Sequence, residues 1–144
     1  MKRNKGFSLL ELLIVVAIIL IIATIAIPSL LRSRQTAHES AAVGTLKSLS
    51  TAEISYTTFS RGLYATMAEM IGAGLLPQNL AGASSGYNYT VDLAANRRDY
   101  TIYATAVSSS EGRYDFYESP DYVIRYTTDS TRAPLGQSGL PVHQ

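Results

Sequence analysis

Few residues of this chain are of types that do chemistry, and their spacing excludes most kinds of reactive site. The 144 residues include no cysteine, which excludes disulfides, thiolate metal sites and a cysteine nucleophile. The two histidines, His38 and His143, lie too far apart in the sequence to indicate a metal cluster. The run Gly72-Ala73-Gly74 lacks the preceding strand and the following Lys-Ser/Thr of a phosphate-binding loop. We therefore predict no cofactor, no metal site and no enzymatic activity.

One acidic residue, Glu11, stands out by its position near the start of an apolar stretch from Phe7 to Ile27. A lone carboxylate in such a segment costs about 3 kcal/mol on insertion into a bilayer and usually has a function. The positive end of a helix dipole offsets part of this cost in the first turn. No Lys or Arg lies between residues 6 and 31, so a cation at this depth would be a new amino terminus, formed by cleavage before Phe7. A carboxylate hydrated among the lipid headgroups is the alternative.

The apolar stretch that carries Glu11 is predicted to form a helix long enough to span a bilayer. Its 21 residues would cover roughly 31 Å as a helix, about the thickness of the hydrocarbon core of a bilayer. This length favours a helix over a strand. Lys2, Arg3 and Lys5 precede the stretch, and this charge bias keeps the N-terminus cytoplasmic. An ordinary secretory signal peptide, with a weak cleavage site at Thr24-Ile25-Ala26, is the alternative.

The run Gly6-Phe7-Ser8-Leu9-Leu10-Glu11, between a short basic leader and an unbroken apolar helix, resembles the type IV prepilin signature. That family comprises type IV pilins and the pseudopilins of type II secretion systems. Pro28, which ends the apolar run, lies where the family commonly has a proline. The match covers residues 1–34, about a quarter of the chain.

The resemblance implies how the chain is processed and assembled. A prepilin peptidase would cleave between Gly6 and Phe7 and would N-methylate Phe7. The helix would hold the subunit in the inner membrane, with the N-terminus cytoplasmic, until an assembly platform extracts it into a cell-surface filament. In that homopolymer, Glu11 would pair with the amino terminus at Phe7 of a neighbouring copy and fix the register, because mispairing would leave a buried carboxylate without a partner.

The chain departs from the family in two places. Position 20 is Leu where members often have Gly, so a loosening of the helix between residues 20 and 28 in filaments is less expected here. Pro28 by itself removes the hydrogen bond to the Thr24 carbonyl and should kink the helix. Many pilins also fasten their C-terminal loop with a disulfide, and this chain has no cysteine to do so.

Three functions are compared at this point. The first, which we favour, is a structural subunit of a type IV pilus, serving adhesion, motility or DNA uptake. The second is a pseudopilin of a type II secretion piston. The third is a membrane-anchored enzyme, for which the sequence offers no nucleophile–base pair. A net charge of +1 argues against a dedicated nucleic-acid binder, so we expect no specific nucleic acid as a partner.

The organisation that follows is a leader (1–6), a transmembrane and assembly helix (7–28) and a periplasmic or extracellular head (29–144). One helix is predicted from about Phe7 to Thr58, apolar in its first half and amphipathic in its second. The stripe of its second half consists of Ala42, Leu46, Leu49, Tyr56 and Phe59. A connecting region over residues 60–86 contains a short helical turn at residues 67–71, closed by Gly72 and Gly74.

The rest of the head predicts an antiparallel sheet, which makes the fold class α+β. Alternation predicts strands at 87–93 and 100–107, with Tyr87, Tyr89, Val91 and Leu93 on one face of the first. A third strand is predicted at 114–117 and a possible fourth at 122–127. The sheet of three to four strands would bury the stripe of the helix on one face. The tail, residues 129–144, is expected to be irregular.

The remaining polar and aromatic residues of the head are interpreted as structural. His38 is predicted to be an exposed helix residue, and the tyrosines from Tyr87 onward are predicted to fill the core rather than form an adhesive surface. The triplet Asn88-Tyr89-Thr90 matches a glycosylation sequon of a kind that is common by chance. The spacing of five acids near the C-terminus matches no calcium loop: Glu111, Asp115, Glu118, Asp121 and Asp129.

Overall fold

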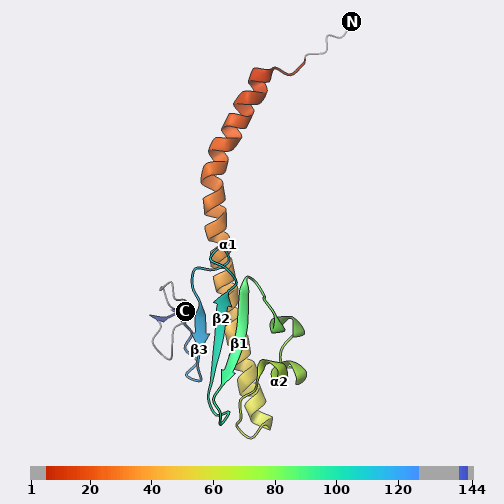
Figure 1. Cartoon of the computed structure of the whole chain (residues 1–144), viewed down its shortest axis with the longest axis vertical. Coiled ribbons are helices and arrows are strands. Elements are labelled where there is room, and N and C mark those ends of the chain that lie inside the picture. The colour runs from red at the N-terminus through yellow and green to blue at the C-terminus, as the bar shows by residue number, and fades with distance from the viewer. Residues whose placement is uncertain (1–5, 127–139, 143–144) are drawn as a thin grey trace. The chain divides into compact units, whose positions relative to one another are not determined.

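The computed structural model describes residues 6–126 and 140–142, and the chain divides into two compact units. The first unit runs from residue 1 to residue 34 and the second from residue 35 to residue 144. One helix, α1 (Leu9–Phe59), contributes to both units, and all the strands belong to the second (Figure 1).

The first unit is the apolar part of α1. The helix begins at Leu9, two residues after the predicted start, and continues through Pro28. It is long and apolar enough to cross a membrane. No second helix or strand occurs among the described residues of this unit, and its large apolar side chains are accordingly exposed. Every backbone group of a helix interior is bonded within the helix, which is the requirement that lipid imposes on a spanning segment.

In the second unit, α1 packs one stripe against the sheet. Ala42, Leu46 and Leu49 are fully buried, and Tyr56 packs against the core while partly buried, as predicted. The prediction for Phe59 is wrong, because its side chain is 60% exposed. Phe59 is the last residue of α1, and its ring packs edge-on against Tyr56 with 4.9 Å between the centroids. Two glutamates, described below, occupy the buried stripe as well.

The Ser and Thr side chains of this part of α1 bond to the helix itself. The Thr51 hydroxyl donates to the Lys47 carbonyl at 2.8 Å, and the Ser55 hydroxyl donates to the Thr51 carbonyl at 2.9 Å. Such bonds to a carbonyl three or four residues earlier satisfy the hydroxyl without any partner outside the helix. The same pattern is formed by Thr45, Ser48, Ser50, Thr57 and Thr58.

The connecting region begins where α1 ends. Arg61 and Gly62 have φ values of 59° and 81°, and this left-handed backbone stops the helix. The predicted helical turn is confirmed as α2 (Met67–Gly72), whose first turn is closed by a capping box between Thr66 and Glu69. A short 3-10 helix, η1 (Gln78–Ala81), follows and leads to the sheet.

Over the described residues, the sheet has five antiparallel strands in the order β1-β2-β3-β4-β5, so each strand pairs with the next along the chain. This confirms the α+β class with one strand more than the upper expectation. The strands are β1 (Tyr87–Leu93), β2 (Tyr100–Ala106), β3 (Phe116–Glu118), β4 (Arg125–Tyr126) and β5 (Leu140–Pro141). β1 is found over the predicted residues, and β2 ends one residue earlier than predicted.

β3 and β4 differ from their predicted ranges for local reasons. The Asp115 carboxylate accepts the Ala106 amide at 2.8 Å, so a side chain bonds to that amide just before β3 begins. Before β4, Tyr122 has a φ of 59° and its amide donates to the Ser119 carbonyl at 2.9 Å, which forms a turn where a strand was predicted. Residue 127, the last of the predicted fourth strand, lies outside the described residues.

The expectation of an irregular tail is wrong for residues 140–142. Leu140 pairs with Tyr126 and Pro141 with Arg125, while the Val142 amide donates to the Ile124 carbonyl at 2.8 Å. A two-residue strand that contains a proline has no signal in the sequence, because it depends entirely on a partner strand. This pairing fastens the C-terminal end of the chain without a disulfide. Residues 127–139 and 143–144 lie outside the described part.

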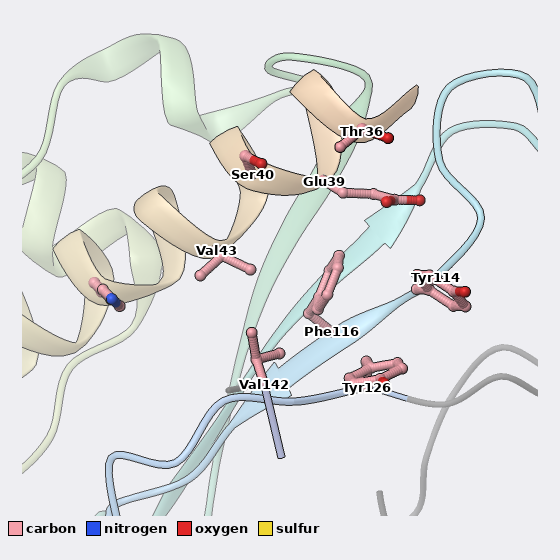
Figure 2. Close-up of a pocket in the computed structure, with 9 residues that line it drawn as sticks. Thr36, Glu39, Ser40, Val43, Tyr114, Phe116, Tyr126 and Val142 are labelled. Atoms are coloured by element: carbon pink, nitrogen blue, oxygen red, sulfur yellow. The ribbon is translucent and has the colours of Figure 1, made fainter. Parts of the chain in front are cut away.

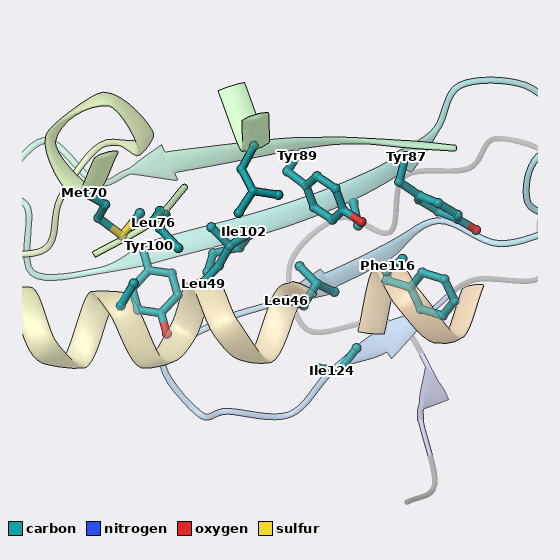
Figure 3. Close-up of a cluster of buried hydrophobic side chains, with 14 of the residues drawn as sticks. Leu46, Leu49, Met70, Leu76, Tyr87, Tyr89, Tyr100, Ile102, Phe116 and Ile124 are labelled. Atoms are coloured by element: carbon teal, nitrogen blue, oxygen red, sulfur yellow. The ribbon is translucent and has the colours of Figure 1, made fainter. Parts of the chain in front are cut away.

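The core lies between α1 and the inner face of the sheet (Figure 3). Burial alternates along β1 and β2 as predicted, so that Tyr87 and Tyr89 point toward α1 and Asn88 and Thr90 toward solvent. Tyr100 joins them in the core at 2% exposure, which confirms the structural interpretation for these tyrosines. The aromatic rings thus fill a small core that has no cysteine or tryptophan.

Candidate functional site

The residues predicted to be processed lie just outside α1. Gly6, Phe7 and Ser8 have no regular secondary structure, and the Leu12 amide donates to the Ser8 carbonyl at 3.2 Å as the first helical bond. The Phe7 side chain is 78% exposed, and Gly6 has no side chain to shield the bond between them. The peptide bond between Gly6 and Phe7 therefore lies in an accessible, non-helical segment.

Glu11 lies in the first turn of α1, as the sequence predicted. Its side chain is exposed, and none of the described residues forms an ion pair with its carboxylate. The N-terminal amides of α1 are the positive groups that lie near such a carboxylate. Within the described part of one chain, the Glu11 carboxylate therefore has no ion-pair partner.

Pro28 lies inside α1, and residues 20–28 are helical. The Thr24 hydroxyl donates to the Ile21 carbonyl at 2.7 Å, within the turn that Pro28 deprives of a backbone bond. The large apolar residues around it, from Ile14 to Leu31, are about half exposed or more. Nothing in the first unit, as far as the structure describes it, covers this apolar surface.

In the second unit, α1 is fastened to the turn between β2 and β3 by a side-chain pair that sequence reasoning missed. Both carboxylate oxygens of Glu39 accept hydrogen bonds from the Arg113 guanidinium, at 3.1 and 2.9 Å, and the Arg113 amide donates to the same carboxylate at 2.9 Å. Glu39 is 7% exposed, and its side-chain hydrogen bonds, together with its charge, raise the pKa of Arg113. Glu39 lies three residues before Ala42, on the stripe that α1 buries, and this spacing was the available signal.

The prediction that His38 is simply an exposed helix residue is wrong. Its side chain is 20% exposed, and Nδ1 lies 2.9 Å from a carboxylate oxygen of Glu111 in the same turn. One turn earlier on α1, the Gln35 amide group donates to the Ser109 carbonyl at 2.8 Å. The packing here is close, because a Cβ on Gly86 would lie 2.7 Å from the His38 ring. We call Gln35, His38 and Glu39, with the turn they hold (108–113), the clasp.

A second fastening, at the other end of the head, is centred on Arg97 in the turn between β1 and β2. Its Nε donates to the Tyr64 carbonyl at 3.0 Å, and its Nη2 donates to the Glu69 carboxylate. The Tyr64 amide in turn donates to the Arg97 carbonyl at 2.9 Å. Hydrogen bonds from Thr66 and Arg97 lower the pKa of Glu69. Arg97 joins the connecting region to the sheet, although its backbone φ of 53° is rare outside glycine.

Two further glutamates, Glu53 on α1 and Glu118 on β3, are buried in the interface between helix and sheet at 0% and 2% exposure. Burial raises the pKa of Glu53 to about 7 and also raises the pKa of Glu118. One carboxylate oxygen of each has no hydrogen-bond partner among the described residues. Neither residue was singled out as buried from the sequence, since carboxylates are rarely placed in a core.

A groove of about 430 Å³ lies between α1 and the strands β3 and β4 (Figure 2). Phe116, Tyr114 and Tyr126 form one side, and Val43 and Ser40 of α1 face them. The Glu39 carboxylate at the groove is bonded to the Arg113 guanidinium, and Lys47 of α1 also lines the groove. In the described part of the chain, no three His, Asp or Glu side chains gather as metal ligands, and Asp129 lies outside it.

The amino-acid sequence of this chain is similar to one protein family and to two characterised proteins. Residues 1–27 match the family described as the prokaryotic N-terminal methylation motif. The chain is 36% identical over 139 residues to the type IV wide pilus major component PilA4 of Thermus thermophilus, covering 96% of this chain and 98% of that protein. It is 40% identical over 93 residues to the type IV major pilin protein PilA of Myxococcus xanthus, covering 65% of this chain but only 39% of that protein. No solved structure matches.

Proposed function

Because this chain belongs to the type IV pilin family, we propose that it is a structural subunit that polymerises through its apolar N-terminal helix into a type IV pilus. The observation that carries the proposal is the exposure of the large apolar side chains from Phe7 to Leu31. A contiguous apolar surface of this size marks contact with a membrane or with other proteins. Lipid covers it before assembly, and the helices of neighbouring copies cover it in the filament.

Processing turns the precursor into the assembling subunit. A prepilin peptidase cleaves the accessible bond between Gly6 and Phe7 and methylates the new amino group of Phe7, as the methylation motif over residues 1–27 supports. Removal of the leader leaves 144 − 6 = 138 residues. It also removes Lys2, Arg3 and Lys5, so the formal charge changes from +1 to 9 − 11 = −2.

Glu11 fixes the register between copies. Its carboxylate is exposed in the first turn of α1 and has no ion-pair partner among the described residues of its own chain. The amino group at Phe7 of a neighbouring copy supplies the missing cation. In a dry bundle of helices, a copy docked in the wrong register leaves this carboxylate without a partner, which costs several kcal/mol.

Before assembly, the subunit is a single-pass protein of the inner membrane, with a cytoplasmic N-terminus and the head on the far side. The basic leader supports this orientation. An assembly platform in the inner membrane then extracts the subunit into a filament at the cell surface. The proposed role is structural rather than enzymatic, which the two relatives support, since both are named as pilus components or pilins.

The proposal is tested by mass spectrometry of a sheared cell-surface fraction, with the N-terminus of this protein mapped. A chain that begins at methylated Phe7 and is abundant in that fraction supports the pilus. The same processed chain, confined to the inner membrane and periplasm, supports instead a pseudopilin of a type II secretion piston. A chain that begins at Ile27 would show an ordinary secreted protein and would overturn both.

A further inference from the structure

Glu53 occupies an unusual position for a carboxylate. It lies on the stripe of α1 that faces the sheet, and its side chain is fully buried. One carboxylate oxygen accepts the amide of Ala65 at 2.9 Å. The other oxygen is buried and has no hydrogen-bond partner among the described residues. An ionised carboxylate held in this way lacks hydrogen-bond donors for one of its two oxygens, and burying that charge costs free energy. The protonated carboxyl carries no charge, so its burial costs far less.

The groups that face Glu53 do not compensate its charge. Arg97, from the turn between β1 and β2, is a cation that favours the ionised form of Glu53, but its guanidinium is bonded to the Tyr64 carbonyl and to Glu69. Glu69, on α2, adds a negative charge that opposes ionisation, and the Tyr64 phenol lies on the same side. Burial outweighs the Ala65 amide and Arg97, so the pKa of Glu53 rises to about 7.

The bond from Glu53 holds a particular segment of the chain. Residues 63–66 cross from the end of α1 to the start of α2, and Ala65 is fully buried there against the core. The neighbouring residue Tyr64 is bonded to Arg97 through both its amide and its carbonyl. The next residue, Thr66, is the N-cap of α2. Glu53 is thus a hydrogen-bond contact by which α1 holds the crossing, and the Ser60 hydroxyl, just after α1, donates to the Leu63 carbonyl at its start.

We propose that Glu53 is a pH-sensitive latch within the head: protonated, its carboxyl holds the 63–66 crossing on α1, and ionised, it leaves the interface and releases that crossing. The proton passes to solvent as the carboxylate becomes hydrated, and no other group is consumed. The latch is a property of the head alone and does not depend on the proposed function. In any assembly of this chain, the crossing would be held tightest in mildly acidic surroundings.

The test is hydrogen–deuterium exchange of the full chain in detergent micelles at pH 5 and pH 8, with rates corrected for the intrinsic pH dependence of exchange. If opening exposes the carboxyl, a shift from 4.5 to about 7 changes the opening equilibrium on the order of fiftyfold between these pH values. We expect amides of the 63–66 crossing to lose protection to this extent at pH 8.

Two substitutions separate the latch from other causes. Glu53→Gln keeps an oxygen that accepts the Ala65 amide but does not titrate, so the pH effect on the crossing should disappear. Glu118→Gln, on β3, removes the other buried carboxylate whose pKa is raised, and the groups that act on it are Ser50, Asp121 and Lys47 rather than the crossing, so the effect should persist. Protection that is equal at both pH values in the unmodified chain, or a pH effect that survives Glu53→Gln, overturns the proposal.

If the Glu53→Gln variant does not fold, the proposal can still be tested by titrating the Glu53 carboxyl group in the unmodified chain. The carboxyl carbon of Glu53 in the unmodified chain is followed by nuclear magnetic resonance after selective labelling. A midpoint near 7 supports the latch, and a midpoint near the ordinary glutamate value of 4.5 overturns it.

Discussion

The Glu39 carboxylate accepts three hydrogen bonds from Arg113, one from the backbone amide and two from the guanidinium. The two residues are 74 positions apart, so this pair joins α1 directly to the turn between β2 and β3. It belongs to the clasp, in which three residues of α1 within five positions hold the same turn. Such fastening matters in a head that has no disulfide.

The two partners of this pair should not be equally important. Glu39→Ala leaves the Arg113 amide without its acceptor and should reduce the free energy of unfolding by about 2 kcal/mol. Arg113→Ala keeps the backbone bond but leaves a carboxylate that is 7% exposed without its cation, so the loss should be larger, about 3 kcal/mol. Thermal unfolding of the full chain in micelles measures both, with the exposed Arg98→Ala as control. Equal losses for the two variants would show that the buried carboxylate does not need the guanidinium.

Two glycines should respond in opposite directions to alanine. A Cβ on Gly112 would lie 2.0 Å from the Tyr87 hydroxyl oxygen, so Gly112→Ala should cost about 2 kcal/mol or more through a forced shift of a buried ring. Gly44 lies inside α1 with nothing within 4 Å of an added Cβ, so Gly44→Ala should raise stability by roughly 0.5–1 kcal/mol. Thermal midpoints of the two variants in micelles decide this. A destabilising Gly44→Ala would mean that the position is constrained in some other way.

The stability of the head should fall as pH rises from about 5 to 8. The pKa values of Glu53 and Glu118 are raised from 4.5 by burial, so their contribution is fully present below pH 4.5 and is lost as pH rises through the folded value. For Glu53, a folded pKa of about 7 corresponds to about 3 kcal/mol at alkaline pH. Thermal midpoints of the full chain at several pH values give the curve. Glu53→Gln combined with Glu118→Gln should flatten it, and a midpoint that rises over this range would refute the prediction.

Glu11→Gln should separate membrane insertion from filament growth. The amide keeps the size of the side chain but removes the charge that we propose pairs with the amino group of a neighbouring Phe7. We expect normal amounts of the subunit in the inner membrane and at least a tenfold loss of surface filaments, since about 1.4 kcal/mol per contact already changes an equilibrium tenfold. Fractionation and electron microscopy measure the two. Ser8→Ala serves as control, and filaments of normal number from Glu11→Gln would show that the charge is not needed.

The features that were predictable from the sequence depend on local pattern. The long helix follows from its apolar run and from the stripe at Ala42, Leu46 and Leu49, and β1 follows from alternation at Tyr87 and Tyr89. The processing and assembly residues are predicted from a signature of a few adjacent residues, and they stay a prediction. Periodicity and signatures of this kind depend only on residues that are close together in the sequence, so they can be recognised in a single sequence.

The features that were missed depend on partners far away in the sequence. β5 exists only because Leu140 and Pro141 meet β4, and the clasp exists only because α1 meets a turn 74 residues later. The burial of Glu53 could not be predicted from its neighbours in the sequence, because it depends on contact with the 63–66 crossing. Long-range pairing of short or polar segments leaves no periodic trace, which is why a single sequence cannot supply it.

The hydroxyl groups along the second half of α1 have hydrogen-bond acceptors within the helix itself, so their bonding does not depend on whether water or protein covers them. By composition its outer face is polar, yet the protons of Ser48, Thr51 and Ser55 are already given to carbonyls of the same helix. Burial of these hydroxyls against another protein therefore leaves none of them without an acceptor. Exposing them to water again gains little hydrogen-bonding free energy. A subunit that must exchange water for protein contact along a filament gains from a surface on which that exchange is nearly free of cost.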